Sequence, residues 1–111
     1  MTIWLPRHNV RNMLAEPSPW IYLVTVRLKP DADVVGFNKW YDERHGPALL
    51  SVPGINSLDR FQSLDGEGTY LACYGIDGEH VFDHPRYTEV RGFQGWDNQV
   101  QEFHRALYRA G

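Results

Sequence analysis

The stretch WYDERHGP at residues 40–47, followed by Val52-Pro53-Gly54, places the end of one helix directly before the start of a strand. On a helical wheel at about 100° per residue, one face collects the residues Val34, Phe37, Tyr41, His45 and Ala48. The opposite face collects Lys39, Asp42 and Glu43. A titratable imidazole therefore shares the inward stripe with apolar residues, one turn after a tyrosine.

The helix that carries this stretch has recognisable ends. Asp31 or Asp33 can cap its first turn, and it is expected to run to about His45. Gly46 predicts a stop at the C-terminal end, and Pro47 cannot donate the next hydrogen bond. A short turn over residues 48–51 is expected before Pro53-Gly54 opens the next strand.

Strand signals flank the helix on both sides. Runs rich in β-branched and aromatic residues predict strands over residues 20–29, 55–63 and 69–77, and a partly alternating run predicts a last strand over 103–109. The loop DGEG at 65–68 joins two of them as a hairpin. A helical region broken at Pro85 is expected over 79–92. The order β-α-β-β-α-β predicts an α+β protein, a ferredoxin-like sandwich with its helices on one face of an antiparallel sheet.

Two of these strands are apolar on both faces. Ile21 and Leu23 add apolar side chains to the odd positions of the first strand, and Leu71 and Cys73 do so in the third. Because helices cover one face only, the other face must be buried by something else. A second copy of the chain, packed sheet against sheet, is the economical solution. We therefore expect a homodimer that forms a dimeric α/β barrel.

Residues 1–19 are expected to form an N-terminal extension rather than an element, with the domain spanning 20–111. Pro6, Pro17 and Pro19 interrupt any helix there. The simplest interpretation is a loosely attached arm. The alternative is an arm that crosses a neighbouring subunit or closes over a pocket.

Composition narrows the class of protein. A chain of 111 residues with 42% hydrophobic residues fits one globular domain with a sizeable core. A net charge of -3 without a Lys/Arg cluster argues against a nucleic-acid partner. No apolar run approaches the length of a membrane span, no signal peptide is recognisable, and the single Cys73 fits a reducing compartment. We therefore expect a cytoplasmic protein without a membrane partner.

Three features together resemble the EthD-type family of the dimeric α/β-barrel superfamily: Tyr41-x-x-x-His45-x-Pro47, the Pro53-Gly54 turn, and Arg60 in the following strand. The resemblance covers about residues 20–110. It implies a barrel-shaped dimer with one ligand cavity per subunit. Relatives include cofactor-free monooxygenases, cyclases, isomerases, decarboxylases, haem-degrading enzymes and members without known activity, so the fold does not settle the function.

His45 and Tyr41 are the candidate catalytic residues. A neutral imidazole can take or give a proton near pH 7, and burial lowers its pKa and favours the neutral base. Tyr41, one turn earlier, could donate a hydrogen bond to a developing enolate or phenolate oxygen. The alternative is a structural histidine that satisfies carbonyl groups where the helix breaks.

Other side chains are candidates for substrate binding. Arg60 or His84 would anchor an acidic group, while Trp40, Tyr22 and Tyr87 would provide flat walls. Each has a simpler interpretation: Arg60 paired with Asp59 of a neighbouring chain, His84 on a surface loop, and Trp40 in the core. The five histidines lack metal-binding spacings, and nucleotide-binding glycine motifs are absent.

These residues predict a small enzyme that needs no cofactor and acts on a hydrophobic, aromatic or unsaturated carbonyl compound. The expected chemistry is proton transfer: isomerisation, cyclisation, dehydration or decarboxylation, as in an isomerase or lyase. Two alternatives remain. One is a cofactor-free or haem-related monooxygenase; the other is a non-catalytic, ligand-binding accessory module.

Overall fold

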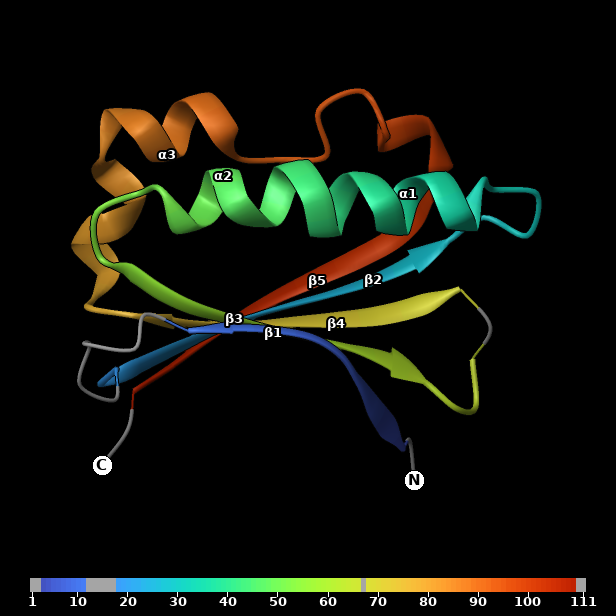
Figure 1. The fold of residues 1–111 in the computed structure, drawn as a ribbon, viewed down its shortest axis with the longest axis horizontal. Helices are drawn as coiled ribbons and strands as arrows, with labels where there is room; N and C mark the ends of the chain where they lie inside the picture. The colour runs from blue at the N-terminus through green and yellow to red at the C-terminus, as the bar shows by residue number, and fades with distance from the viewer. Residues whose placement is uncertain (1–2, 12–17, 67, 110–111) are drawn as a thin grey trace.

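The computed structural model describes residues 3–11, 18–66 and 68–109. Within them, one antiparallel sheet contains β1 (Trp4–Arg11), β2 (Trp20–Leu28), β3 (Ile55–Ser63), β4 (Thr69–Ile76) and β5 (Val100–Arg109). The strand order is β1-β3-β4-β2-β5. Without β1, this order is that of the ferredoxin-like sandwich, so the predicted α+β fold is confirmed. The helices form a layer on one face of the sheet (Figure 1).

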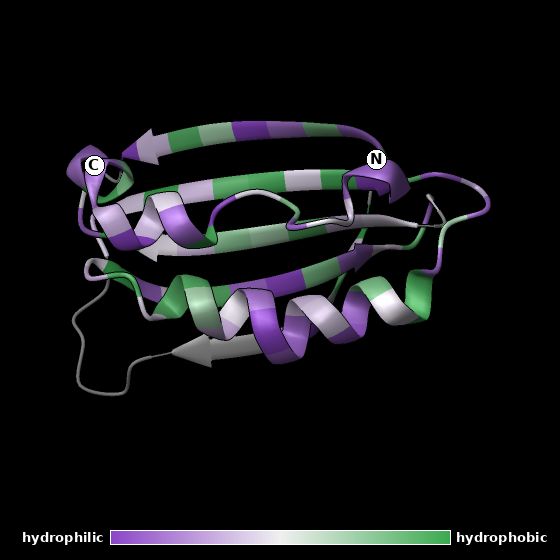
Figure 2. Ribbon diagram, turned by 90° about the horizontal axis from the view of Figure 1, so that it is seen from above, coloured by the Kyte–Doolittle hydropathy of each residue, from purple (hydrophilic) through white to green (hydrophobic). Residues whose placement is uncertain are grey.

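The first helical segment is continuous from residue 34 to residue 50. It consists of α1 (Val34–Trp40), the π-helical turn η1 (Tyr41–His45) and α2 (Gly46–Leu50). The Asp33 side chain caps its start by accepting a hydrogen bond from the Gly36 N–H. The second region contains η2 (Glu79–Asp83), α3 (Pro85–Val90) and the short η3 (Asp97–Gln99). Seen from above, both regions lie over the same face of the sheet (Figure 2).

The predicted stop at Gly46 is wrong. Gly46 has helical backbone angles (φ -58°, ψ -53°), and its N–H donates to the carbonyl of Tyr41 across the wider π turn. Pro47, which has no N–H to donate, is accommodated in the first turn of α2. A Cβ atom on Gly46 would lie 2.8 Å from Cδ2 of Leu58. The glycine therefore allows the helix to approach β3 closely and does not end it.

The expectation that residues 1–19 contain no element is also wrong for part of that segment. Trp4–Arg11 forms β1, which pairs antiparallel with β3 of the same chain. Without this pairing, β3 would be an edge strand with unpaired backbone groups. β1 itself lies at the edge of the sheet, where a proline such as Pro6 is tolerated. Residues 12–17 lie outside the described residues. The division into an extension (1–19) and a domain (20–111) stays a prediction.

The core lies between the sheet and the helices. Its most deeply buried apolar side chains are Phe37, Val52, Leu58, Tyr74, Ile76 and Val81. On the opposite face, Ile21 is 39% exposed and Tyr108 57% exposed, and they are paired in register across β2 and β5. No element of the described ranges covers this face (Figure 1). None of the helices in those ranges is long and apolar enough to cross a membrane.

Candidate functional site

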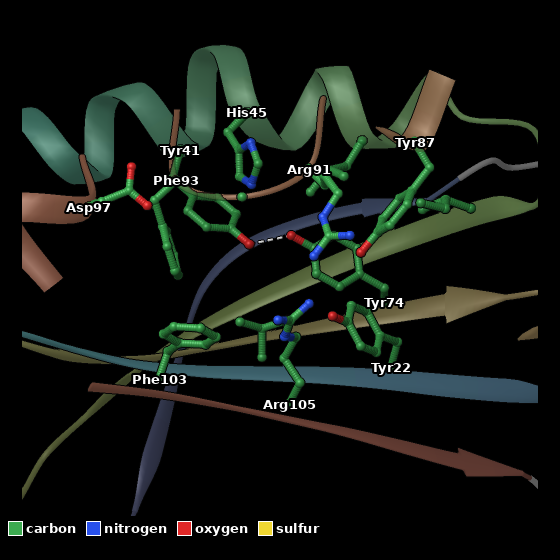
Figure 3. A pocket seen from close by; sticks show the side chains of 14 residues that line it. Tyr22, Tyr41, His45, Tyr74, Tyr87, Arg91, Phe93, Asp97, Phe103 and Arg105 are labelled. Carbon is green, nitrogen blue, oxygen red and sulfur yellow. Dashed lines mark hydrogen bonds between the residues drawn. The ribbon is translucent and has the colours of Figure 1, made fainter. Parts of the chain in front are cut away.

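A cavity of about 200 Å³ lies between the helical layer and the sheet. Its polar lining consists of Tyr22, Tyr41, His45, Tyr74, Tyr87, Arg91, Asp97 and Arg105 (Figure 3). Its apolar lining includes Val24, Leu49, Ile55, Phe93 and Phe103. Tyr41, His45 and Tyr74 are buried, whereas Arg91 and Arg105 are exposed. The cavity therefore has a buried end beneath the first helix and a mouth beside α3 and β5.

His45 enters the buried end from the π turn and is only 6% exposed. Its imidazole stacks on the Trp40 ring, with centroids 4.5 Å apart, and meets the Tyr41 ring edge-on at 4.8 Å. Burial, and secondarily the charge of Arg60, lower the pKa of His45 to about 4. At neutral pH this residue is therefore an uncharged base that faces a cavity.

The alternative role for His45 is to hydrogen-bond to carbonyl groups at the end of a helix, and this role requires the helix to end at Gly46. The helix does not break at Gly46 but continues through α2. Among the described residues, no carbonyl group accepts a hydrogen bond from the imidazole. The ring nitrogens of His45 thus remain available to a ligand in the cavity.

Two tyrosine hydroxyl groups meet beside His45. Those of Tyr41 and Tyr74 hydrogen-bond to each other, from the helix and from β4 respectively (Figure 3). Burial raises the pKa of Tyr41 to about 12, and burial together with the adjacent Tyr41 raises that of Tyr74. Both therefore stay protonated. Because only one hydrogen of such a pair lies between the two oxygens, the other can be donated to an oxygen of a ligand.

Arg60 lies behind this pair and does not line the cavity. It is 1% exposed, and it donates to Asp42 Oδ1 at 2.7 Å and to Asn38 Oδ1 at 3.0 Å. Its guanidinium carbon lies 4.1 Å from the centre of the Tyr41 ring. Asp42 also pairs with Arg7 of β1 at 3.3 Å. The structure thus places Arg60 in an internal ion pair that supports Tyr41 from behind.

The remaining predicted residues divide into two groups. Tyr22 and Tyr87 line the cavity together with Tyr41 and His45. Trp40 does not line it but supports the imidazole by stacking. His84 lies elsewhere, at the start of α3, where its Nδ1 accepts a hydrogen bond from the Arg86 N–H at 3.0 Å. His84 therefore acts in this structure as a helix cap.

Comparison with known proteins found neither a matching family model nor a curated relative. Solved structures do match. One is a candidate monooxygenase from Lactobacillus acidophilus, with a TM-score of 0.63, 19% identity and coverage of 87% of this chain and 50% of that one. A second is a heme-degrading enzyme from Listeria monocytogenes, with a TM-score of 0.66, 14% identity and coverage of 97% and 71%.

A third match is a ferredoxin-fold protein from Listeria monocytogenes related to antibiotic biosynthesis monooxygenases. Its TM-score is 0.63, with 13% identity and coverage of 97% of this chain and 64% of that one. This chain shares their ferredoxin-like fold. It spans about half the length of the Lactobacillus protein, and at these identities the likeness concerns the fold alone.

Several cavity residues escaped the sequence reasoning. Tyr74 could have been found, because it alternates with Tyr70 and Ala72 on the inward face of its strand. Arg91 and Arg105 belong to no motif. Arg105 reaches the cavity because β5 pairs with β2, which places it opposite Val24. Within the described residues, no group of three His, Cys, Asp or Glu side chains is arranged to hold a metal ion.

Proposed function

We propose that this protein is a small-molecule monooxygenase in which His45 removes a proton from the substrate and dioxygen oxidises the resulting anion. The substrate would carry an acidic CH₂ group next to an aromatic ring and a carbonyl group. The observation that carries the proposal is the neutral, buried His45 beside the Tyr41–Tyr74 hydroxyl pair in a largely apolar cavity. The fold shared with proteins described as monooxygenases also supports it.

The protein's own side chains would act in the first step. The imidazole of His45 takes a proton from the CH₂ group, and a base in this position typically contributes about 10²–10⁴-fold. Negative charge then develops on the carbonyl oxygen of the substrate. The Tyr41–Tyr74 pair donates a hydrogen bond to that oxygen, in a site where burial strengthens the interaction.

The oxidation balances without a further reductant. The carbanion gives its electron pair to dioxygen, a carbon–oxygen bond forms, and protonation yields a hydroperoxide. Loss of the second C–H proton with cleavage of the O–O bond then releases water and leaves a carbonyl group. The sum is R₂CH₂ + O₂ → R₂C=O + H₂O, with carbon as the reductant and dioxygen as the oxidant.

An alternative function begins with the same proton transfer to His45 but does not use oxygen. In it, the anion is reprotonated or loses a leaving group, which gives isomerisation, cyclisation, dehydration or decarboxylation, as in an isomerase or lyase. The same His45 and tyrosine pair would serve this chemistry, and the resemblance of residues 41–47 to the EthD-type family motivates it. A non-catalytic accessory module would use the cavity for binding alone.

Haem does not fit the cavity as it stands. Sites for drug-sized ligands typically measure about 300–1,000 Å³, and a porphyrin is at the upper end of that range in size. The cavity here is about 200 Å³. A haem-related activity would therefore require the mouth to open widely, and added haemin would then give a Soret band.

We also propose that the uncovered face of the sheet binds a second copy of the chain. Ile21 and Tyr108 are exposed there, and half-buried Leu23, Phe61 and Leu71 lie on the same face. Such an apolar face is typical of a symmetric interface. Each subunit would keep its own cavity, because the cavity lies on the opposite, helical side.

The test is oxygen uptake with a panel of ketones that carry an acidic CH₂ group activated by an aromatic ring and a carbonyl group, such as anthrone and 2-tetralone. The proposal predicts one O₂ consumed per substrate and ¹⁸O from ¹⁸O₂ in the product carbonyl. His45→Gln should reduce the rate at least about 10²-fold. Turnover without oxygen uptake would favour the proton-transfer alternative. Binding without turnover on any compound would favour the accessory module.

A further inference from the structure

Two arginines from different elements share the mouth of the cavity. Arg91 follows α3, and Arg105 lies on β5; both are exposed, and both line the cavity. Figure 3 shows their guanidinium groups directed toward the same part of the cavity, near Tyr22 and Tyr87. Aromatic rings flank both groups: Arg91 lies 5.9 Å from the Tyr87 ring centre, and Arg105 lies 5.3 Å from that of Phe103.

Neither guanidinium group has a carboxylate partner at ion-pair distance within the described ranges of the chain. By contrast, Arg27 pairs with Glu102 and Arg60 pairs with Asp42. Asp97 also lines the cavity, but it lies toward Phe93 in Figure 3, and its carboxylate accepts from the Gly95 N–H at 3.4 Å. Two like charges thus face one concave site without a counter-ion, an arrangement that a bound anion would stabilise.

The positive charges of Arg91 and Arg105 also act on the same side chain, that of Tyr87. Burial raises the pKa of Tyr87 to about 12, while Arg91 and Arg105 both oppose this rise. Their fields therefore converge at the hydroxyl group of Tyr87. Tyr22 and Tyr87 place their hydroxyl groups at the same end of the cavity.

We propose that Arg91 and Arg105 bind the carboxylate of an aromatic or unsaturated organic acid, so that the substrate is an anion. Arginine suits this role because its planar group can donate two parallel hydrogen bonds to one carboxylate. The carboxylate would lie at the mouth, and the ring would extend past Phe103 toward the buried end. The reacting carbon would then lie near His45, a placement that rests on the proposed function.

Matched pairs of ligands test the charge directly. We would measure dissociation constants calorimetrically at low ionic strength for 2-naphthoate against 2-naphthamide, and for cinnamate against cinnamamide. The variants are Arg91→Gln and Arg105→Gln. Arg109→Gln is the matched control, because it removes the same charge from β5 outside the cavity lining.

The wild type should bind each acid at least about tenfold more tightly than its amide. Each cavity variant should lose roughly tenfold in affinity for the acid and less than about twofold for the amide, as expected when one charge-assisted hydrogen bond is removed. Arg109→Gln should keep the full preference. Added salt should weaken acid binding, because the arginines are exposed.

Equal affinity for acid and amide, or failure of every acid to bind at millimolar concentration, would overturn the inference. Survival of the acid preference in both cavity variants would do the same. The outcome is independent of the proposed function, because binding is measured without turnover. If acids bind through the arginines but His45→Gln does not impair any reaction, the anion site stands and the monooxygenase proposal fails.

Discussion

The burial of His45 makes the stability of this protein depend on pH in a specific way. The pKa of the imidazole falls from about 6.5 in the unfolded chain to about 4 in the folded protein. Between these values the unfolded state binds a proton that the folded state excludes, so the free energy of unfolding decreases as pH falls through this window. The full difference corresponds to roughly 3 kcal/mol, of which about 2 kcal/mol should be lost by pH 5.

Substitution of His45 by Gln removes this titration. Urea unfolding of the wild type and of His45→Gln at pH 7.5, 6.5, 5.5 and 5.0 gives the difference in unfolding free energy, in which the contributions of all other titrating groups cancel. This difference should shift by about 2 kcal/mol in favour of the variant between pH 7.5 and pH 5.

A packing control separates titration from a general loss of contacts. Leu49, which is 6% exposed, lines the same cavity, so Leu49→Ala should destabilise the protein by about 2–5 kcal/mol at every pH. Its curve should run parallel to that of the wild type. If the curves of His45→Gln and the wild type also run parallel, the imidazole is not the buried neutral base described above.

Three further predictions concern other parts of the structure. Tyr41→Phe should lower kcat roughly 10²-fold in a steady-state assay, because an oxyanion donor is lost; an unchanged kcat would remove the hydroxyl pair from the mechanism. Asp42→Ala leaves a 1% exposed guanidinium without its ion partner and should lower the unfolding free energy by about 3 kcal/mol. Glu89→Ala, which breaks an exposed pair, should cost less than about 1 kcal/mol in the same denaturation experiment; equal losses would contradict this ranking. Ile21→Lys on the uncovered face should yield monomers in analytical ultracentrifugation while Val35→Lys on the helical side, 80% exposed, stays dimeric; a monomeric wild type would refute the interface.

Local patterns were enough to predict the main elements of the fold. Strands over 55–63 and 69–77 joined as a hairpin were predicted correctly, and Asp33, one of two candidate caps, caps the first helix. The end of that helix was mispredicted because Gly46 and Pro47 are normally stop signals. Here the π turn and the contact with Leu58 override them. β1 was missed because Pro6 lies within it and because the strand is held by its pairing with β3, which no local pattern shows.

The candidate site was predictable only where its residues share one element. Tyr41 and His45 are one turn apart on the same helix, so their common face follows from periodicity. The sequence did not assign Arg60 to either face of its strand, and its partner Asp42 was assigned to the outer face of the helix. The partnership of Arg91 with Arg105 depends on how α3 and β5 meet in space, which no local pattern encodes.

The most direct test of the central claim is proton exchange in the absence of oxygen. Phenylpyruvate carries an acidic CH₂ group between a ring and a carbonyl, together with a carboxylate. In anaerobic D₂O, NMR should show the wild type exchanging these protons for deuterium well above the buffer rate, with about 10²-fold or more of this acceleration lost in His45→Gln. Exchange at the same rate with wild type and variant would contradict the assignment of His45 as the base.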